Sequence, residues 1–137
     1  MYIAVCYQSR GGNTKKVAEA IAKALHTAAW DIDEVKDLEC DLLVFGSAVY
    51  AASLDKKTKA FLDSLKGTSA RRVALFGTSA GGKKPFGMMK RLLKEKGIPV
   101  DENFFYAPGS FLFMNKGRPN EEDLAQAAEW AKSLIQE

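Results

Sequence analysis

Residues 2–14 have the sequence Tyr-Ile-Ala-Val-Cys-Tyr-Gln-Ser-Arg-Gly-Gly-Asn-Thr. The first six form a nearly continuous apolar run, which is typical of a strand buried on both faces of a parallel sheet. Polar residues and two glycines follow at 9–14. Apolar residues then recur at helical spacing, at Val17, Ala18, Ile21, Ala22 and Leu25. The segment therefore predicts a buried strand, a glycine-bearing loop and an amphipathic helix.

The rest of the chain repeats this alternation. Further strands are expected at 30–33 (a weak one), 41–46, 72–77 and 103–107. Further helices are expected at 54–66, in the stretch that ends before Gly97, and after Asn120. This order predicts an α/β fold, a doubly wound five-stranded parallel sheet of strand order 2-1-3-4-5 with helices on both faces. The link at 34–40 is shorter than the dozen or so residues that a crossover needs, so we expect a stub of helix or an irregular turn there.

Composition places the chain among ordinary globular proteins. Its 137 residues predict a single domain over 1–137, and 47% of them are hydrophobic and 27% charged. No uncharged stretch approaches the roughly 20 residues of a membrane span, and the N-terminus lacks the basic lead of a signal peptide. We therefore expect a cytoplasmic protein without membrane insertion.

Few residue sets suggest side-chain chemistry. Cys6 and Cys40 show no zinc spacing and are expected at opposite ends of the sheet, so we predict two structural thiols and no disulfide. The single histidine, His26, is expected near the end of the first helix, where a cation suits the helix dipole. No Ser/His/Asp set or pair of carboxylates stands out, so the sequence predicts neither a catalytic side chain nor a metal site.

Three loops are expected to meet beyond the carboxyl ends of the strands, where ligands of such sheets bind. They are residues 9–14, 47–53 and 78–84. The first combines glycines, hydroxyls and the start of a helix, which suits a phosphate group because successive N–H groups point at the anion. The alternative is a plain strand-to-helix turn with Thr14 as the helix cap.

The pattern Tyr7-x-Ser9-x-x-Gly12-Asn13-Thr14 resembles the phosphate loop of flavodoxins, which bind flavin mononucleotide (FMN). The segments 45–50 and 75–82 resemble, in register, the two flavin-contacting loops of that family. The resemblance implies that the flavin phosphate is held by Ser9, Arg10, Gly11, Gly12, Asn13 and Thr14. It implies that one side of the isoalloxazine is lined by Ala48, Val49, Tyr50 and Ala51, with Tyr50 stacking on the ring or, alternatively, a core or rim tyrosine. It implies that the pyrimidine end meets Thr78, Ser79, Ala80, Gly81 and Gly82.

The sequence departs from the family pattern in three places. Gly11 stands where many relatives carry a third hydroxyl, and Arg10 is expected to compensate. Ala51 stands where many flavodoxins carry a glycine whose peptide turns on reduction. Because alanine resists positive φ, we expect the one-electron-reduced flavin to be less stabilised. The third loop lacks an outer aromatic residue. The flavin face on that side is therefore expected to be open, or to be covered by Phe86 or by residues 111–114 (Phe-Leu-Phe-Met). Residues 111–114 have an alternative role as core residues under the final helix.

Charge is unevenly distributed along the chain. The net charge is +3, and residues 56–96 contain 12 basic and 2 acidic residues. Right-handed crossovers would place the two basic helices on one face of the sheet. This face is either an ordinary solvated surface or one that attracts an acidic redox partner or an anionic substrate. A nucleic-acid partner is not expected, because no recognised motif accompanies the charge.

Three functions are compatible with these residues. The first is an FMN-binding, flavodoxin-like redox protein that transfers electrons between redox partner proteins. The alternative is an FMN-dependent oxidoreductase acting directly on a small conjugated substrate of the quinone or tetrapyrrole type, which the departure at Ala51 and the open third loop favour. The third is a binding module that has lost its flavin, against which the intact phosphate loop argues.

Overall fold

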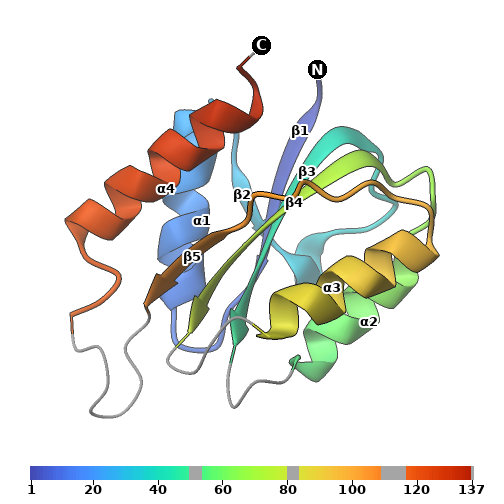
Figure 1. Ribbon diagram of the computed structural model, residues 1–137, viewed down its shortest axis with the longest axis horizontal. Coiled ribbons are helices and arrows are strands. Elements are labelled where there is room, and N and C mark those ends of the chain that lie inside the picture. The colour runs from blue at the N-terminus through green and yellow to red at the C-terminus, as the bar shows by residue number, and fades with distance from the viewer. Residues whose placement is uncertain (50–53, 80–83, 109–116, 137) are drawn as a thin grey trace.

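The computed structural model describes residues 1–49, 54–79, 84–108 and 117–136, and these form an α/β fold (Figure 1). Five strands make one sheet of order β2-β1-β3-β4-β5, and every neighbouring pair is parallel. The strands are β1 (Ile3–Gln8), β2 (Ala29–Asp31), β3 (Cys40–Val49), β4 (Ala70–Ser79) and β5 (Phe105–Pro108). The doubly wound sheet and its strand order, predicted from the sequence, are confirmed.

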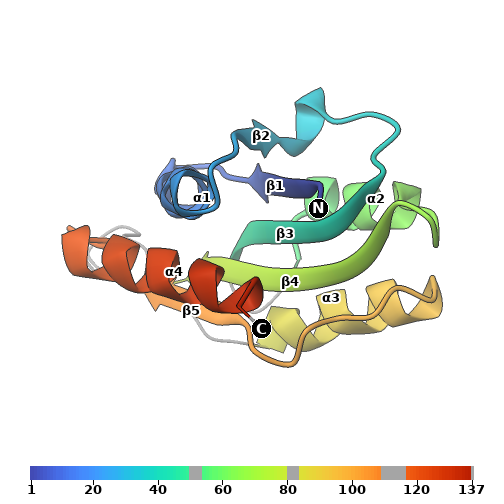
Figure 2. The ribbon, with the colours of Figure 1, turned by 90° about the horizontal axis from the view of Figure 1, so that it is seen from above.

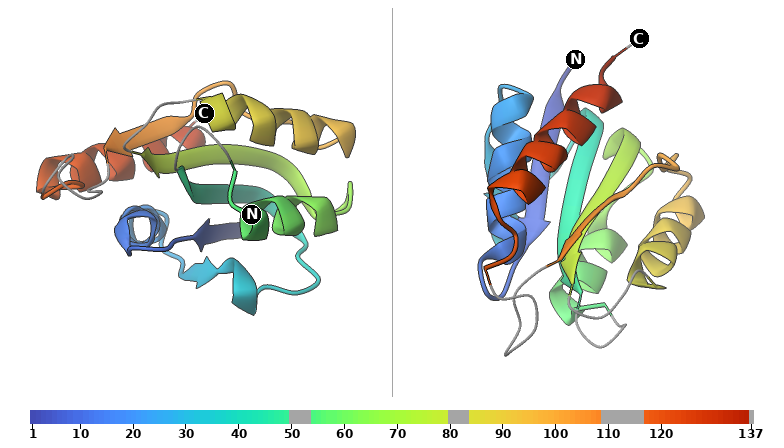
Figure 3. Two further views of the ribbon diagram at one scale, coloured as in Figure 1. Left: turned by 90° about the horizontal axis from the view of Figure 1, so that it is seen from below. Right: turned by 60° about the vertical axis from the view of Figure 1, so that its left-hand side comes forward.

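The described residues form four α-helices, which cover the two faces of the sheet (Figures 2 and 3). Helices α1 (Asn13–Ala24) and α4 (Glu121–Leu134) lie on one face, and α2 (Lys56–Ser64) and α3 (Lys84–Glu95) lie side by side on the other. All strands run toward the same edge of the sheet, and α1, α2 and α3 begin at that edge (Figure 1). This carboxyl edge is where the three candidate loops were expected to meet.

The apolar core is divided by the sheet into two layers. Neighbouring residues of β3 point to opposite faces, as the period of a strand requires, so Val44 belongs to one layer and Phe45 to the other. The layer under α1 and α4 includes Val17, Ile21, Val44, Phe76 and Ala131. The layer under α2 and α3 includes Phe45, Phe61, Leu62, Met89 and Leu93. These buried apolar stripes hold the helices against the sheet.

The two central strands extend further than the sequence predicts. β3 and β4 run to Val49 and Ser79, beyond the expected ends at 46 and 77. The reason is mutual pairing, because Ala48 lies opposite Thr78 and Val49 opposite Ser79 in the parallel ladder. The first residues of the expected loops 47–53 and 78–84 are therefore strand residues, held by the sheet.

The short link between β2 and β3 contains the expected stub of helix. One turn of 3₁₀ helix covers Ile32–Glu34, and Asp31 caps it by accepting the N–H of Asp33 at 2.9 Å. No α-helix follows before β3. The side chain of Trp30 on the edge strand is consequently 49% exposed.

Both cysteines are buried and free, as predicted. Burial raises the pKa of the Cys6 thiol to about 12 and that of Cys40 to about 11. Both side chains are therefore protonated at neutral pH, which makes them inert structural thiols. In the part of the chain that the structure describes, no group of three or more His, Cys, Asp or Glu residues is arranged to hold a metal ion.

The end of α1 places His26 in the left-handed region, with φ 56°. Its N–H donates to the Lys23 carbonyl at 3.2 Å, and the N–H of Thr27 donates to the Ala22 carbonyl at 2.9 Å. This pair of bonds is the Schellman motif, in which glycine usually occupies the left-handed position.

None of the helices in the described segments is both long enough and apolar enough to cross a bilayer.

Candidate functional site

The loop between β1 and α1 turns sharply at Gly12. This residue has φ +90° and ψ −5°, a left-handed conformation that is strained for any residue with a Cβ. The N–H of Gly12 donates to Oγ of Ser9 at 3.0 Å, and this hydrogen bond joins the first and last residues of the turn. The chain thus leaves the buried end of β1 and enters α1 within four residues.

The N-terminus of α1 differs from those of two other helices. Its N-cap is Gly12, which makes no side-chain capping bond, and its first turn carries no acidic residue. By contrast, Asp55 caps α2 by accepting the N–H of Lys57 at 2.8 Å, and Asn120 caps α4 in a reciprocal pair with Asp123. The positive end of the α1 dipole therefore lacks a negative partner on its own helix.

Space for a ligand lies beside this turn. A Cβ placed on Gly11 or Gly12 would meet no other heavy atom within 4 Å, so the backbone faces an open region. Backbone N–H groups, the Ser9 hydroxyl and an uncapped helix start are the features that bind phosphate groups in proteins. The residues present therefore fit a phosphate monoester. The alternative role of Thr14 as the helix cap is wrong, because the cap position belongs to Gly12.

Thr14 instead fastens the first candidate segment to the third. Its side chain is fully buried, and its Oγ1 lies 2.8 Å from Oγ1 of Thr78 at the end of β4. Thr78 in turn lies opposite Ala48 on β3 and Ala107 on β5. Residues predicted from three separate parts of the chain, Thr14, Ala48 and Thr78, are thus brought together at the carboxyl edge.

A second buried polar group holds the ends of β1 and β3. Oγ of Ser47 lies 2.8 Å from Oγ1 of Thr58 on α2, and 3.5 Å from Oε1 of Gln8. All three side chains are buried. Sequence reasoning missed Gln8 and Thr58, although a polar residue at the end of the apolar run of β1 was a visible signal.

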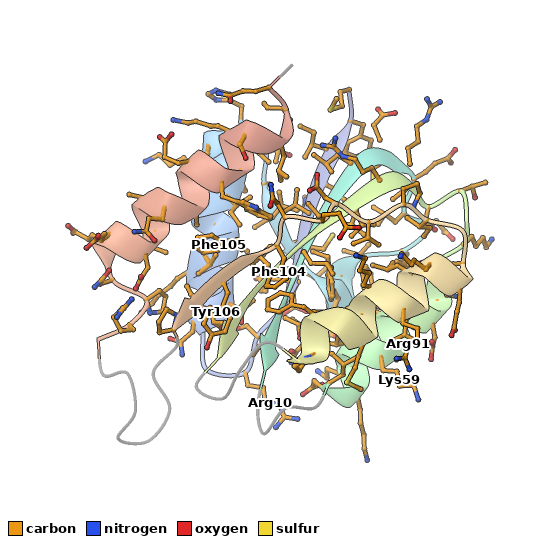
Figure 4. The ribbon with its side chains drawn as sticks, in the orientation of Figure 1. Arg10, Lys59, Arg91, Phe104, Phe105 and Tyr106 are labelled. Atoms are coloured by element: carbon orange, nitrogen blue, oxygen red, sulfur yellow. The ribbon has the colours of Figure 1, made fainter. Side chains whose placement is uncertain are left out.

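Arg10 lies at the carboxyl edge (Figure 4), where its side chain bonds Asp55, the N-cap of α2. Its Nε donates to Oδ2 of Asp55 at 2.6 Å, across 45 positions of sequence. The Asp55 side chain is 6% exposed and that of Arg10 is 64% exposed. The carboxylate therefore serves both the first turn of α2 and the loop that follows β1. Sequence reasoning missed Asp55, because no spacing rule links residues so far apart.

Phe86 does not cover the expected flavin face, contrary to one of the two sequence-based hypotheses. Its side chain is only 3% exposed and stacks on Phe104 with ring centroids 4.2 Å apart. The same ring lies so close to Gly77 that a Cβ there would approach it to 2.9 Å. Phe86 therefore belongs to the core under α3.

The remaining predicted residues are only partly described. Val49 and Ser79 are the last residues of β3 and β4, and Asn13 is the first of α1. The other predicted positions lie outside the described residues: Tyr50, Ala51, Ala80, Gly81, Gly82 and the 111–114 segment. The hypotheses that concern them stay predictions.

Comparisons with known proteins agree with this geometry. A family model described as a flavodoxin domain matches residues 4–105. An uncharacterized protein of Methanocaldococcus jannaschii is 34% identical in an alignment 141 residues long that covers 90% of each chain. A solved flavodoxin from the domain Archaea has a TM-score of 0.82 at 20% identity, over 98% of this chain and 96% of that one. Oxidised flavodoxin 2 from Bacillus cereus has a TM-score of 0.74 at 18% identity, over 97% of both.

The two solved structures share the fold, and the family model spans β1 to the start of β5, including the candidate phosphate loop and the carboxyl ends of β3 and β4. Sheet order, loop positions and sequence match thus point the same way, and the chain belongs to the flavodoxin family.

Proposed function

We propose that this chain is an FMN-binding redox protein that transfers electrons between redox partner proteins. The observation that carries the proposal is the N-terminus of α1. Its N-cap is the left-handed Gly12, no side chain caps it, and the space beside the turn is open. A flavin nucleotide with a single phosphate matches both this anion site and the family to which the chain belongs. FMN, when bound, supplies the redox chemistry.

The described residues have definite tasks in this proposal. The Ser9 hydroxyl, whose oxygen accepts the N–H of Gly12, and the other N–H groups of residues 9–14 would bind the phosphate, and glycine at position 12 permits the turn that orients them. The Thr14–Thr78 bond sets the depth of α1 against β4, and the Ser47–Thr58 bond sets α2 against β3. Residues 48–51 and 78–82 would then line the isoalloxazine, as the family resemblance implies. The protein's contribution is orientation and electrostatics rather than acid–base catalysis.

The phosphate assignment is tested by comparing FMN with riboflavin, which has the same ring system and no phosphate. The chain, freed of flavin, is titrated with each ligand, and quenching of flavin fluorescence measures binding. We expect FMN to bind at least 100-fold more tightly than riboflavin, because only FMN has the group that the α1 N-terminus fits. Equal affinities, or no binding of either flavin, would contradict the proposal.

A second assay separates an electron carrier from an oxidoreductase. The FMN-loaded protein is mixed with NADH and benzoquinone, with no other protein present, and NADH consumption is followed. An electron carrier should give no sustained turnover, because it accepts electrons from NADH only through a separate reductase protein. Sustained turnover would favour the alternative of direct action on a small conjugated substrate.

A further inference from the structure

Helices α2 and α3 form one continuous outer face beside the candidate flavin site. They lie side by side on the same side of the sheet, and both begin at the carboxyl edge (Figures 1 and 3). Arg10 of the phosphate loop contacts Asp55, the cap of α2, so this face begins directly next to the site. A molecule that docked there would reach the edge of the sheet where ligands bind.

The charge of this face is positive, although α2 and α3 also carry two exposed acidic residues, Asp63 and Glu95. Three of its lysines have defined partners: Lys57 binds Asp33 at 3.0 Å, Lys90 binds Glu102 at 2.7 Å, and Lys96 donates to the Asp63 carbonyl at 2.6 Å. Five further cations on or next to these helices make no ion pair within the described segments: Lys56, Lys59, Lys66, Arg91 and Lys94. All five are exposed. We name these five residues the basic face.

An apolar side chain accompanies the charges. Met88 is 39% exposed on α3, one helical turn before Arg91. Figure 4 shows Lys59 on α2 and Arg91 on α3 on the outer side of the two helices, away from the sheet. Methionine and arginine are enriched at protein–protein interfaces, whereas lysine-rich rims supply long-range attraction.

In the segments that the structure describes, α2 and α3 themselves present no exposed aromatic ring, and Phe104 beside α3 is 41% exposed but stacks on Phe86. Proteins that bind single strands present exposed aromatic rings on which bases stack. The aromatic residues of these helices, Phe61 and Phe86, are both buried. The observations therefore favour a folded protein partner over a nucleic acid.

We propose that the basic face, with Met88 beside it, docks an acidic surface of another protein, which is the electron-transfer partner if the proposed function holds. Attraction between opposite charges accelerates such encounters by 10- to 1,000-fold at low salt. The acceleration falls as the Debye length shortens to about 10 Å at 0.1 M salt. The acidity of the partner follows from this chain's charge, and its redox role rests on the proposed function.

The test uses poly-L-glutamate as a model acidic surface and the full chain labelled with ¹⁵N. Amide shifts are recorded during titration of the parent, of the double variant Lys59→Glu/Arg91→Glu, and of a control, Lys23→Glu/Lys132→Glu. The control residues are exposed cations of α1 and α4, on the opposite face of the sheet, and the change in net charge is identical. Thermal melts verify that both variants fold.

We expect shifts concentrated at residues 56–66 and 84–96, and an affinity that falls at least 10-fold in the first variant and less than 3-fold in the control. Equal losses in the two variants would show that net charge alone is responsible and would overturn the proposal. So would submicromolar binding of a 20-base-pair DNA duplex at 0.15 M salt that is lost only in the first variant, because non-specific DNA binding is weaker than this. The readout involves no flavin, so failure of FMN to bind would refute the proposed function without altering this result.

Discussion

Replacing Gly12 by alanine should destabilise the protein, whereas the same change at its neighbour Gly11 should not. Gly12 has φ +90°, and Gly11 has no such constraint, yet the space around both positions is equally open. A clash is therefore excluded at either site, and backbone conformation alone distinguishes them. Left-handed backbone costs an L-residue roughly 1–2 kcal/mol.

The two substitutions restrict the unfolded chain to the same extent, an effect of about 0.4–1 kcal/mol that cancels when the variants are compared. The free energies of unfolding should then differ by about 1.5 kcal/mol, the middle of the range for left-handed strain. With a urea m-value of about 2 kcal/mol/M, the midpoints should be about 0.75 M apart. Urea unfolding of the flavin-free chain, followed by circular dichroism, measures this difference.

FMN titration adds a second readout for the same pair. If the alanine introduced in Gly12→Ala relaxes its φ, the N–H groups of the turn are re-aimed, and FMN affinity should fall more than 10-fold in that variant only. Coincident unfolding midpoints for the two variants would refute the conformational argument. Unequal midpoints with unchanged FMN affinity in both variants would support backbone strain at Gly12 but would show that the turn does not bind FMN.

Three further outcomes are expected. Gly46→Ala should lower the free energy of unfolding by about 1–3 kcal/mol in a denaturant titration, because its Cβ would be placed inside the Phe76 ring, while an unchanged midpoint would contradict the packing. His26→Gly should raise the melting temperature slightly, because the roughly 1–2 kcal/mol of left-handed strain that glycine removes exceeds the about 0.4–1 kcal/mol by which it frees the unfolded chain. A lower melting temperature would be the contrary result. Arg118 bonds the buried Asp123 at 2.6 Å and lowers its pKa. The stability lost in Asp123→Asn should therefore be fully evident above about pH 4, the unfolded pKa, and should shrink as pH falls through the lower folded value; a pH-independent loss would exclude the charge effect.

The fold was predictable because its signals are local. Each buried strand is a short apolar run, and each run is followed by glycine or hydroxyl residues and then by a helical period. The ends of β3 and β4 were not predictable in this way. Ser47 and Thr78 are polar and suggest loop, but their hydroxyls bond Thr58 and Thr14, which only the tertiary structure brings near.

The candidate site was predictable to the same degree. The turn after β1 was located to within two residues, because glycines, hydroxyls and a helix start occur together in sequence, but Asn13 and Thr14 belong to α1 rather than to the loop. The Arg10–Asp55 pair was not, since it joins residues 45 positions apart. The misplacement of Phe86 was avoidable, because Phe86, Met89 and Leu93 share one helical stripe that faces the core.

The meeting of Thr14, Ala48 and Thr78 at the carboxyl edge has a thermodynamic consequence. These residues come from α1, β3 and β4, so no fragment that lacks one of these elements contains the assembled site. A ligand held there binds the native chain and not the unfolded one. The free energy of unfolding therefore rises as the concentration of the ligand rises. At 100 times its dissociation constant, such a ligand adds about 2.7 kcal/mol to the free energy of unfolding. The cellular lifetime of this small domain would thus follow the supply of the molecule that it binds.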